Sequence, residues 1–69
     1  MNPVYMIISN EFQIVVKRTE FAESAAVYML GRKFKDYTLL KVFQEGTIIV
    51  TPCVADVTQL QRLLEETEL

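Results

Sequence analysis

The chain has 69 residues, of which 51% are hydrophobic and 23% are charged, and its formal net charge is −2. This length allows one domain, over residues 1–69, and the apolar content is too high for a disordered chain. Seven basic against nine acidic residues argue against a dedicated nucleic-acid-binding protein.

The first half of the chain predicts a β-hairpin followed by a helix. Residues 4–8 are dense in β-formers, residues 12–17 alternate between apolar and polar, and the polar residues 9–11 between them are typical of a turn. Thr19 is a candidate N-cap, and Gly31 or the segment 33–35 is expected to end the helix. Three- and four-residue spacing predicts one apolar helix face: Phe21, Ala22, Ala25, Ala26, Met29 and Leu30.

The second half repeats this order. Residues 37–43 and 47–51 predict a second hairpin, in whose turn we expect Gly46 to take a positive φ. Pro52 is expected to end strand pairing, and Asp56 with Gln59 is typical of a capping box. The apolar stripe of the final helix is Val57, Leu60, Leu63 and Leu64. Acidic residues at the end of this helix oppose its dipole, so we expect the last turn to fray.

The predicted order is therefore β-β-α-β-β-α. The simplest architecture for it is an α+β fold, in which two helices pack on one face of a four-stranded antiparallel sheet. Residues 11–16 and 45–50 match loosely, and either an internal duplication or shared hairpin character accounts for the match.

Helices on one face leave the other sheet face to be explained. If Phe12, Ile14 and Val16 face the helices, alternation places Val15 on the far face with Gln13 and Lys17. One parity of each remaining strand joins them, drawn from Tyr5, Ile7, Leu39, Lys41, Phe43 and Ile49. Scattered surface hydrophobes, a protein-contact surface and an edge strand that extends into a partner all remain open at this point.

The residues that usually carry catalysis are scarce. The absence of histidine excludes Ser–His and Cys–His nucleophilic catalysis and histidine metal sites. Cys53 is the single cysteine, and we interpret it as a structural residue in a reducing compartment. The N-terminus lacks the pattern of a signal peptide and no apolar run reaches the about 20 residues of a membrane span. We expect a cytoplasmic protein that is not an enzyme and takes no cofactor or metal.

Five of the seven basic residues fall where one strand ends and one helix ends: Lys17, Arg18, Arg32, Lys33 and Lys35. They are expected at one end of the domain, either as a solvated helix end or as a site for an acidic protein surface. With them, the aromatic residues Tyr5, Tyr37 and Phe43 are the candidate protein-binding residues.

Two short segments carry a resemblance. Thr19-Glu20-Phe21-Ala22-Glu23-Ser24-Ala25, where a strand runs into a helix, resembles small phage-encoded α+β proteins. Val50-Thr51-Pro52-Cys53-Val54-Ala55 is similar to the Val-x-Pro-Cys-Val-Ala segment of phage inhibitors of bacterial RNA polymerase. Those inhibitors have basic residues where this chain has Ile49 and Thr51, so polymerase inhibition is not carried over. The resemblance implies a phage protein that occupies a host protein, for host takeover or anti-defence.

The expected function is that of a small non-enzymatic protein-binding module. If the chain is phage-encoded, as the resemblance implies, we expect an inhibitor that blocks a host protein by steric occupation in the cytoplasm of the host cell. The alternative is a homodimeric small-ligand-sensing or regulatory domain. The expected partners are a host protein with an acidic surface or a second copy of the chain, and neither nucleic acid nor a membrane.

Overall fold

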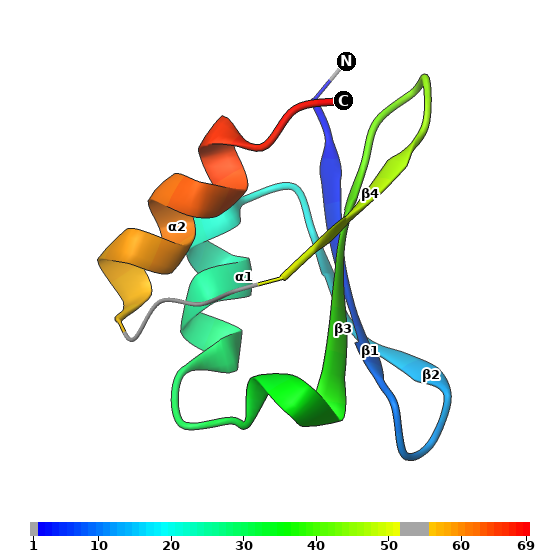
Figure 1. Ribbon diagram of the computed structural model, residues 1–69, viewed down its shortest axis with the longest axis vertical. Helices are drawn as coiled ribbons and strands as arrows, with labels where there is room; N and C mark the ends of the chain where they lie inside the picture. Colours follow the sequence, from blue (N-terminus) through cyan, green and yellow to red (C-terminus); the bar gives the residue numbers. More distant parts are fainter. Residues whose placement is uncertain (1, 52–55) are drawn as a thin grey trace.

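The computed structural model describes residues 2–51 and 56–69. Its four strands form one antiparallel sheet in the order β2-β1-β3-β4, and both α-helices cover the same face of that sheet (Figure 1). The predicted α+β fold is thereby confirmed. The elements are β1 (Val4–Ser9), β2 (Ile14–Thr19), α1 (Ala22–Met29), the short 3₁₀ helix η1 (Phe34–Asp36), β3 (Tyr37–Val42), β4 (Thr47–Val50) and α2 (Val57–Glu66). Within the described parts of the chain, no helix has both the length and the apolar character needed to cross a membrane.

The apolar strand β1 lies in the middle of the sheet, where it pairs with β2 on one side and β3 on the other. Its register with β2 shifts between Ile7 and Ile8, because Ile7 pairs with Lys17 but Ile8 pairs with Val15. Val16 is therefore the extra residue of a β-bulge. The bulge changes which face the following side chains occupy.

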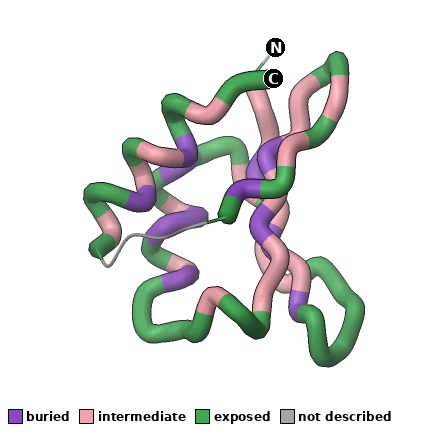
Figure 2. Tube along the Cα trace, viewed as in Figure 1, coloured by how far each residue is buried: buried purple, intermediate pink, exposed green. Residues whose placement is uncertain are grey.

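The hydrophobic core lies between the helices and the sheet, and Figure 2 shows the buried positions on both of these layers. Three of the residues that α1 buries are alanines, which lets this helix lie close to its neighbours. Phe21 and Leu30, predicted on this buried face, are instead 69% and 64% exposed, because they flank the helix where the chain turns. The buried apolar residues are Tyr5, Ile7, Ala22, Ala25, Ala26, Met29, Leu39, Val50, Leu60 and Leu64.

The start of α1 differs from the prediction by two residues. Its N-cap is Phe21, and Thr19 still belongs to β2. The hydroxyl of Thr19 accepts a hydrogen bond from the Phe21 amide at 3.1 Å, so it shapes the strand–helix connection without capping the helix. The end of α1 is as expected, with Gly31 in the left-handed region at φ 79°.

The second hairpin closes without the positive φ expected at Gly46, since among the described glycines only Gly31 has one. Phe43 and Gly46 exchange backbone hydrogen bonds at 2.7 and 3.3 Å across Gln44 and Glu45. Gly46 instead accommodates the C-terminal residue: a Cβ built there would lie 3.6 Å from a methyl group of Leu69. In the first hairpin the left-handed residue is Gln13, at φ 58°.

The start of α2 confirms the predicted N-cap. The Asp56 carboxylate accepts a hydrogen bond from the Gln59 amide at 2.8 Å, which satisfies one free donor of the first turn. The predicted stripe also faces the core, with Leu60 and Leu64 buried and Val57 and Leu63 packed against them. The expectations for Pro52 and Cys53 fall outside the described residues.

Candidate protein-binding face

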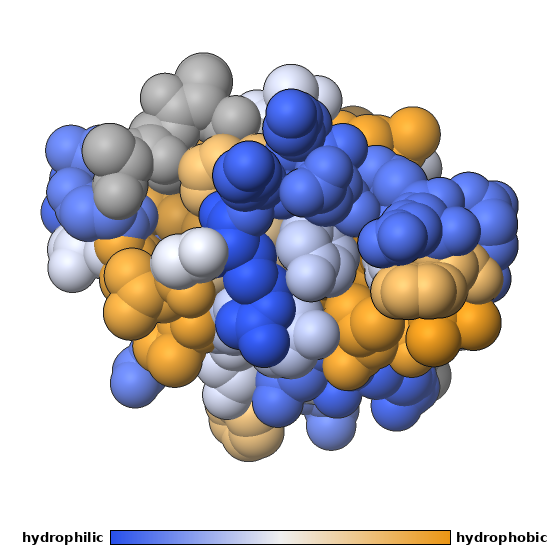
Figure 3. All heavy atoms as spheres, turned by 90° about the horizontal axis from the view of Figure 1, so that it is seen from below, coloured by the Kyte–Doolittle hydropathy of each residue, from blue (hydrophilic) through white to orange (hydrophobic). Residues whose placement is uncertain are grey.

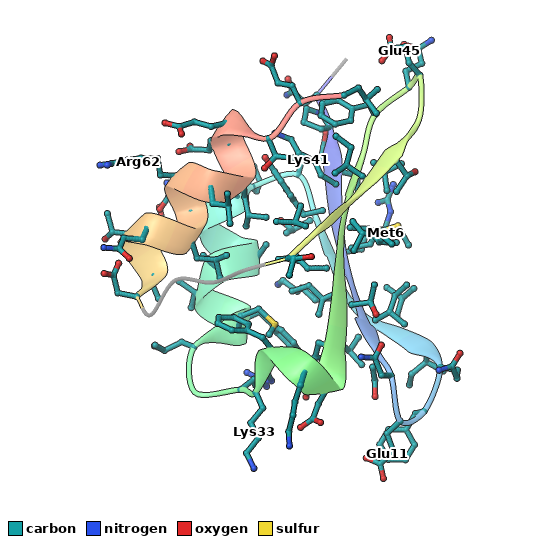
Figure 4. The ribbon with its side chains drawn as sticks, viewed as in Figure 1. Met6, Glu11, Lys33, Lys41, Glu45 and Arg62 are labelled. Atoms are coloured by element: carbon teal, nitrogen blue, oxygen red, sulfur yellow. The ribbon has the colours of Figure 1, made fainter. Side chains whose placement is uncertain are left out.

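Within residues 2–51 and 56–69, one face of the sheet carries no helix, and we call its side chains the open face. The two faces are told apart by burial, which alternates along β1, and by Lys41, which contacts α2. Figure 4 shows Met6 on the side away from the helices and Lys41 on the helix side. The strand pairings extend this assignment across the sheet. The open face consists of Val4, Met6, Ile8, Val15, Arg18, Thr38, Leu40, Val42, Thr47 and Ile49.

The open face is a grid of three cross-strand rows. The central row runs from Arg18 through Met6 and Leu40 to Ile49. One flanking row holds Val4, Val42 and Thr47, and the other holds Val15, Ile8 and Thr38. Seven of the ten side chains are apolar, and Arg18 is the charged one. Viewed from below, hydrophobic residues gather on the strand side and separately on the helix side, with hydrophilic residues between them (Figure 3).

Several of these apolar side chains reach far into solvent. Ile49 is 67% exposed and Val15 is 47% exposed, while Met6 and Leu40 at the centre are half-buried. Phe12 and Ile14 are also exposed at the end of the first hairpin, but Ile14 pairs with the buried Ser9 and so lies on the helix side. An antiparallel sheet with one solvated face normally alternates apolar inward and polar outward. This sheet departs from that pattern on its outward side.

The opposite side of the sheet holds a buried lysine. Lys41 is only 3% exposed, and its Nζ donates to the carbonyl oxygens of Leu64, Glu65 and Thr67 at 2.5, 3.2 and 2.8 Å. These carbonyls belong to the end of α2, where a helix favours a cation. Burial lowers the pKa of Lys41, and the carboxylates of Glu68 and Glu65 act in the opposite direction.

Tyr5 was predicted to bind a partner, and the structure corrects this prediction. Its side chain is 4% exposed and points to the helices, where its hydroxyl donates to the Leu64 carbonyl at 3.4 Å. Burial, assisted by the charge of Glu65, raises the pKa of the Tyr5 phenol. Alternation of a single strand could not decide between the two faces, because residues 4–8 are apolar throughout.

The other two predicted aromatic residues also lie on the helix side. The Phe43 residue is half-buried, and the centre of its ring lies 5.2 Å from the Lys41 ammonium, which is also 5.5 Å from the centre of the Tyr5 ring. Tyr37 is half-buried against Tyr28, edge to face, with ring centroids 6.4 Å apart. These contacts are part of the packing between helices and sheet.

The five predicted basic residues divide into separate groups. Lys17 and Arg18 occupy opposite faces of β2, so only Arg18 belongs to the open face. The Arg32 guanidinium covers the Tyr28 ring at 3.9 Å, and Lys17 lines a shallow depression with the same tyrosine. Lys33 and Lys35 are exposed at the η1 end of the molecule, where Figure 4 shows Lys33.

The bulge at Val16 explains why Lys17 is on the helix side although alternation placed it on the far face. Val15 is on the open face as expected, and Val16 packs against the core. Tyr5, Ile7, Leu39 and Lys41, which were considered for the far face, all face the helices. Sequence reasoning missed Met6 and Leu40, which form the centre of the open face.

Comparison with known proteins finds no match for this chain. No protein-family model matches the chain, and neither a curated protein nor a solved structure matches it. The fold is that of a small two-layer α+β domain in which neither α-helix covers the open face of the sheet.

Proposed function

We propose that the protein is a non-enzymatic protein-binding module that binds through its open face. The observation that carries this proposal is the grid of seven apolar side chains that neither helix covers. Contiguous apolar surface rimmed by polar residues marks protein contacts, because covering it removes that surface from water. Binding here would act by occupation of a surface and needs no chemical step.

The ionisable residues of the helix side support binding over catalysis. The ammonium of Lys41 and the hydroxyl of Tyr5 both donate to main-chain carbonyls of α2, and both side chains are shielded from solvent. A general acid or base has to reach the proton of a bound substrate. The chain also contains no histidine, the most common residue for that role.

A finer form of the proposal is a phage-encoded inhibitor that blocks a host protein. It rests on the resemblance carried by residues 19–25 and 50–55, of which 52–55 lie outside the described residues. In this form the open face provides the blocking surface. The basic side chains of Arg32, Lys33 and Lys35 would then guide an acidic partner during approach.

Site-specific photo-crosslinking in cells tests the proposed function. A photoreactive phenylalanine analogue replaces Ile49, whose exposed side chain makes few contacts within the chain. The matched control carries the same group at Thr58, an exposed position on α2. We expect a discrete protein adduct from position 49 and none from position 58. Equal labelling at the two positions, or no adduct at position 49, contradicts the proposal.

A further inference from the structure

We infer that a second copy of this chain covers the open face, so that two sheets pack face to face in a symmetric dimer. This inference rests on the proposed function, because it names the partner of that same surface. Three properties of the open face support it: its composition, the position of its charge and its size.

The composition of the open face favours a permanent partner of the same kind. Its apolar residues are valine, isoleucine, leucine and methionine, and none of its ten residues is aromatic. Transient contacts with other proteins usually depend on tyrosine, tryptophan and arginine anchors. Obligate homodimer interfaces instead resemble a protein core cut in half. The aliphatic grid matches the second description.

The position of the charge makes the open face complementary to itself, as a two-fold interface requires. Arg18 lies on β2, an edge strand of the sheet. A two-fold axis along the strands and over the Met6–Leu40 pair would place the centres of both sheets together. The two Arg18 side chains would then lie at opposite margins, where they keep their water. No charge is buried by this arrangement.

The size of the open face also suits a dimer. Three strands of six residues extend about 20 Å each and β4, with four residues, about 13 Å, so at about 4.8 Å per strand the planar footprint is about 350 Å². Two copies therefore bury at least about 700 Å², and because projecting side chains have more accessible surface than their footprint, the pair approaches from below the about 1,200 Å² at which stable interfaces begin. The product is a helix–sheet–sheet–helix molecule with both faces of each sheet covered.

A second copy also adds hydrophobic packing on the side of the sheet where the single chain has none among its described residues. The described core lies on one side of the sheet, and three of its ten buried apolar residues are alanines. A chain this small has little core to spare. Because other copies are present wherever the chain is made, self-association can remove the open face from water without a different protein.

Analytical ultracentrifugation of the purified full-length chain tests the inference. We expect a mass of twice 8.0 kDa. The proposed axis sets position 49 against Arg18 of the second copy, so Ile49→Lys places two positive charges together. Position 49 is 67% exposed in the single chain, so the fold is retained. We expect the dissociation constant to rise by about 100-fold. Leu40→Glu tests the centre of the face, and the matched control Thr58→Glu stays dimeric. Circular dichroism verifies that each variant is folded.

Two results would overturn the inference. One is a wild-type chain that stays monomeric up to about 100 µM, because the dissociation constant of the dimer would then be too high for the dimer to form in a cell. The other is a dimer that folded Ile49→Lys and Leu40→Glu leave unchanged. The photo-crosslink at position 49 separates this failure from that of the proposed function. With a monomeric wild-type chain, an adduct to a different protein retains the binding face and removes the dimer, whereas no adduct removes both.

Discussion

The Nζ atom of Lys41 lies 2.5 Å from the carbonyl oxygen of Leu64, and this contact joins an inner strand of the sheet to the last turn of α2. The same ammonium reaches the Glu65 and Thr67 carbonyls, so one cation serves three acceptors that the helix itself leaves free. α2 ends in acidic residues that oppose its dipole, and Lys41 supplies the positive charge that the last turn of this helix lacks.

Lys41→Met tests this role. The variant keeps the apolar stem but leaves the α2 carbonyls without their donor, so we expect a loss of about 2 kcal/mol in the free energy of unfolding. Urea denaturation at a fixed protein concentration measures this value. The control Lys33→Met changes an exposed lysine and should stay within about 0.5 kcal/mol of the wild type. A Lys41→Met variant as stable as the control would show that the buried ammonium contributes nothing.

Tyr5 predicts a dependence of stability on pH. Burial raises the pKa of its phenol above the ordinary value of 10.0, so the folded chain holds this proton where the unfolded chain has lost it. Its contribution is complete below pH 10 and is lost as the pH rises through the folded-state pKa. We expect the free energy of unfolding to fall more steeply above pH 10 in the wild type than in Tyr5→Phe. Parallel slopes for the two proteins would contradict the assignment.

Gly31 and Gly46 predict opposite effects of the same substitution. Gly31 has φ 79°, so Gly31→Ala forces an alanine into the left-handed region and should cost about 1 kcal/mol. Gly46 lies outside that region, and a Cβ there meets Leu69 at an ordinary contact distance. Gly46→Ala should therefore be neutral or stabilise by up to about 1 kcal/mol, because the unfolded chain loses freedom. Thermal unfolding of the two variants side by side decides the order.

Gln13 offers a second test of backbone strain. It takes φ 58° in the turn between β1 and β2, and its side-chain amide donates to the Asn10 carbonyl at 2.7 Å. Gln13→Gly relieves about 1 kcal/mol of strain and loses this exposed hydrogen bond. Gln13→Val introduces a β-branched residue that this φ disfavours. In chemical denaturation we expect the free energy of unfolding of Gln13→Gly to exceed that of Gln13→Val by about 1–2 kcal/mol. Equal stabilities would show that the turn adopts another conformation.

Local signals in the sequence were sufficient for the elements and their order. The Asp56 cap, the apolar stripe of α2 and Gly31 at the end of α1 each depend on neighbours along the chain, and each is confirmed. The faces of the strands depend on contacts between distant residues. The apolar run in β1 hides which parity faces the helices, and the bulge at Val16 reverses the alternation in β2.

The candidate site was harder to predict for the same reason. The sequence indicated an apolar far face and placed Val15 and Ile49 among its candidates, but Met6 and Leu40 emerge only from the strand pairing. The burial of Lys41 and Tyr5 depends on main-chain carbonyls of α2, more than twenty residues along the chain from either side chain. No local pattern of residue types indicates such a partner.

The bulge in β2 has a consequence for how the molecule can associate. A sheet grows into fibrils through flat edge strands whose free amide and carbonyl groups take up another strand. β2 is one edge of this sheet, and it carries both a bulge and the adjacent charges of Lys17 and Arg18. We expect this twisted, charged edge to resist strand addition. The chain can thus present its side chains for association while withholding its backbone along this edge, which favours a closed pair over an open polymer.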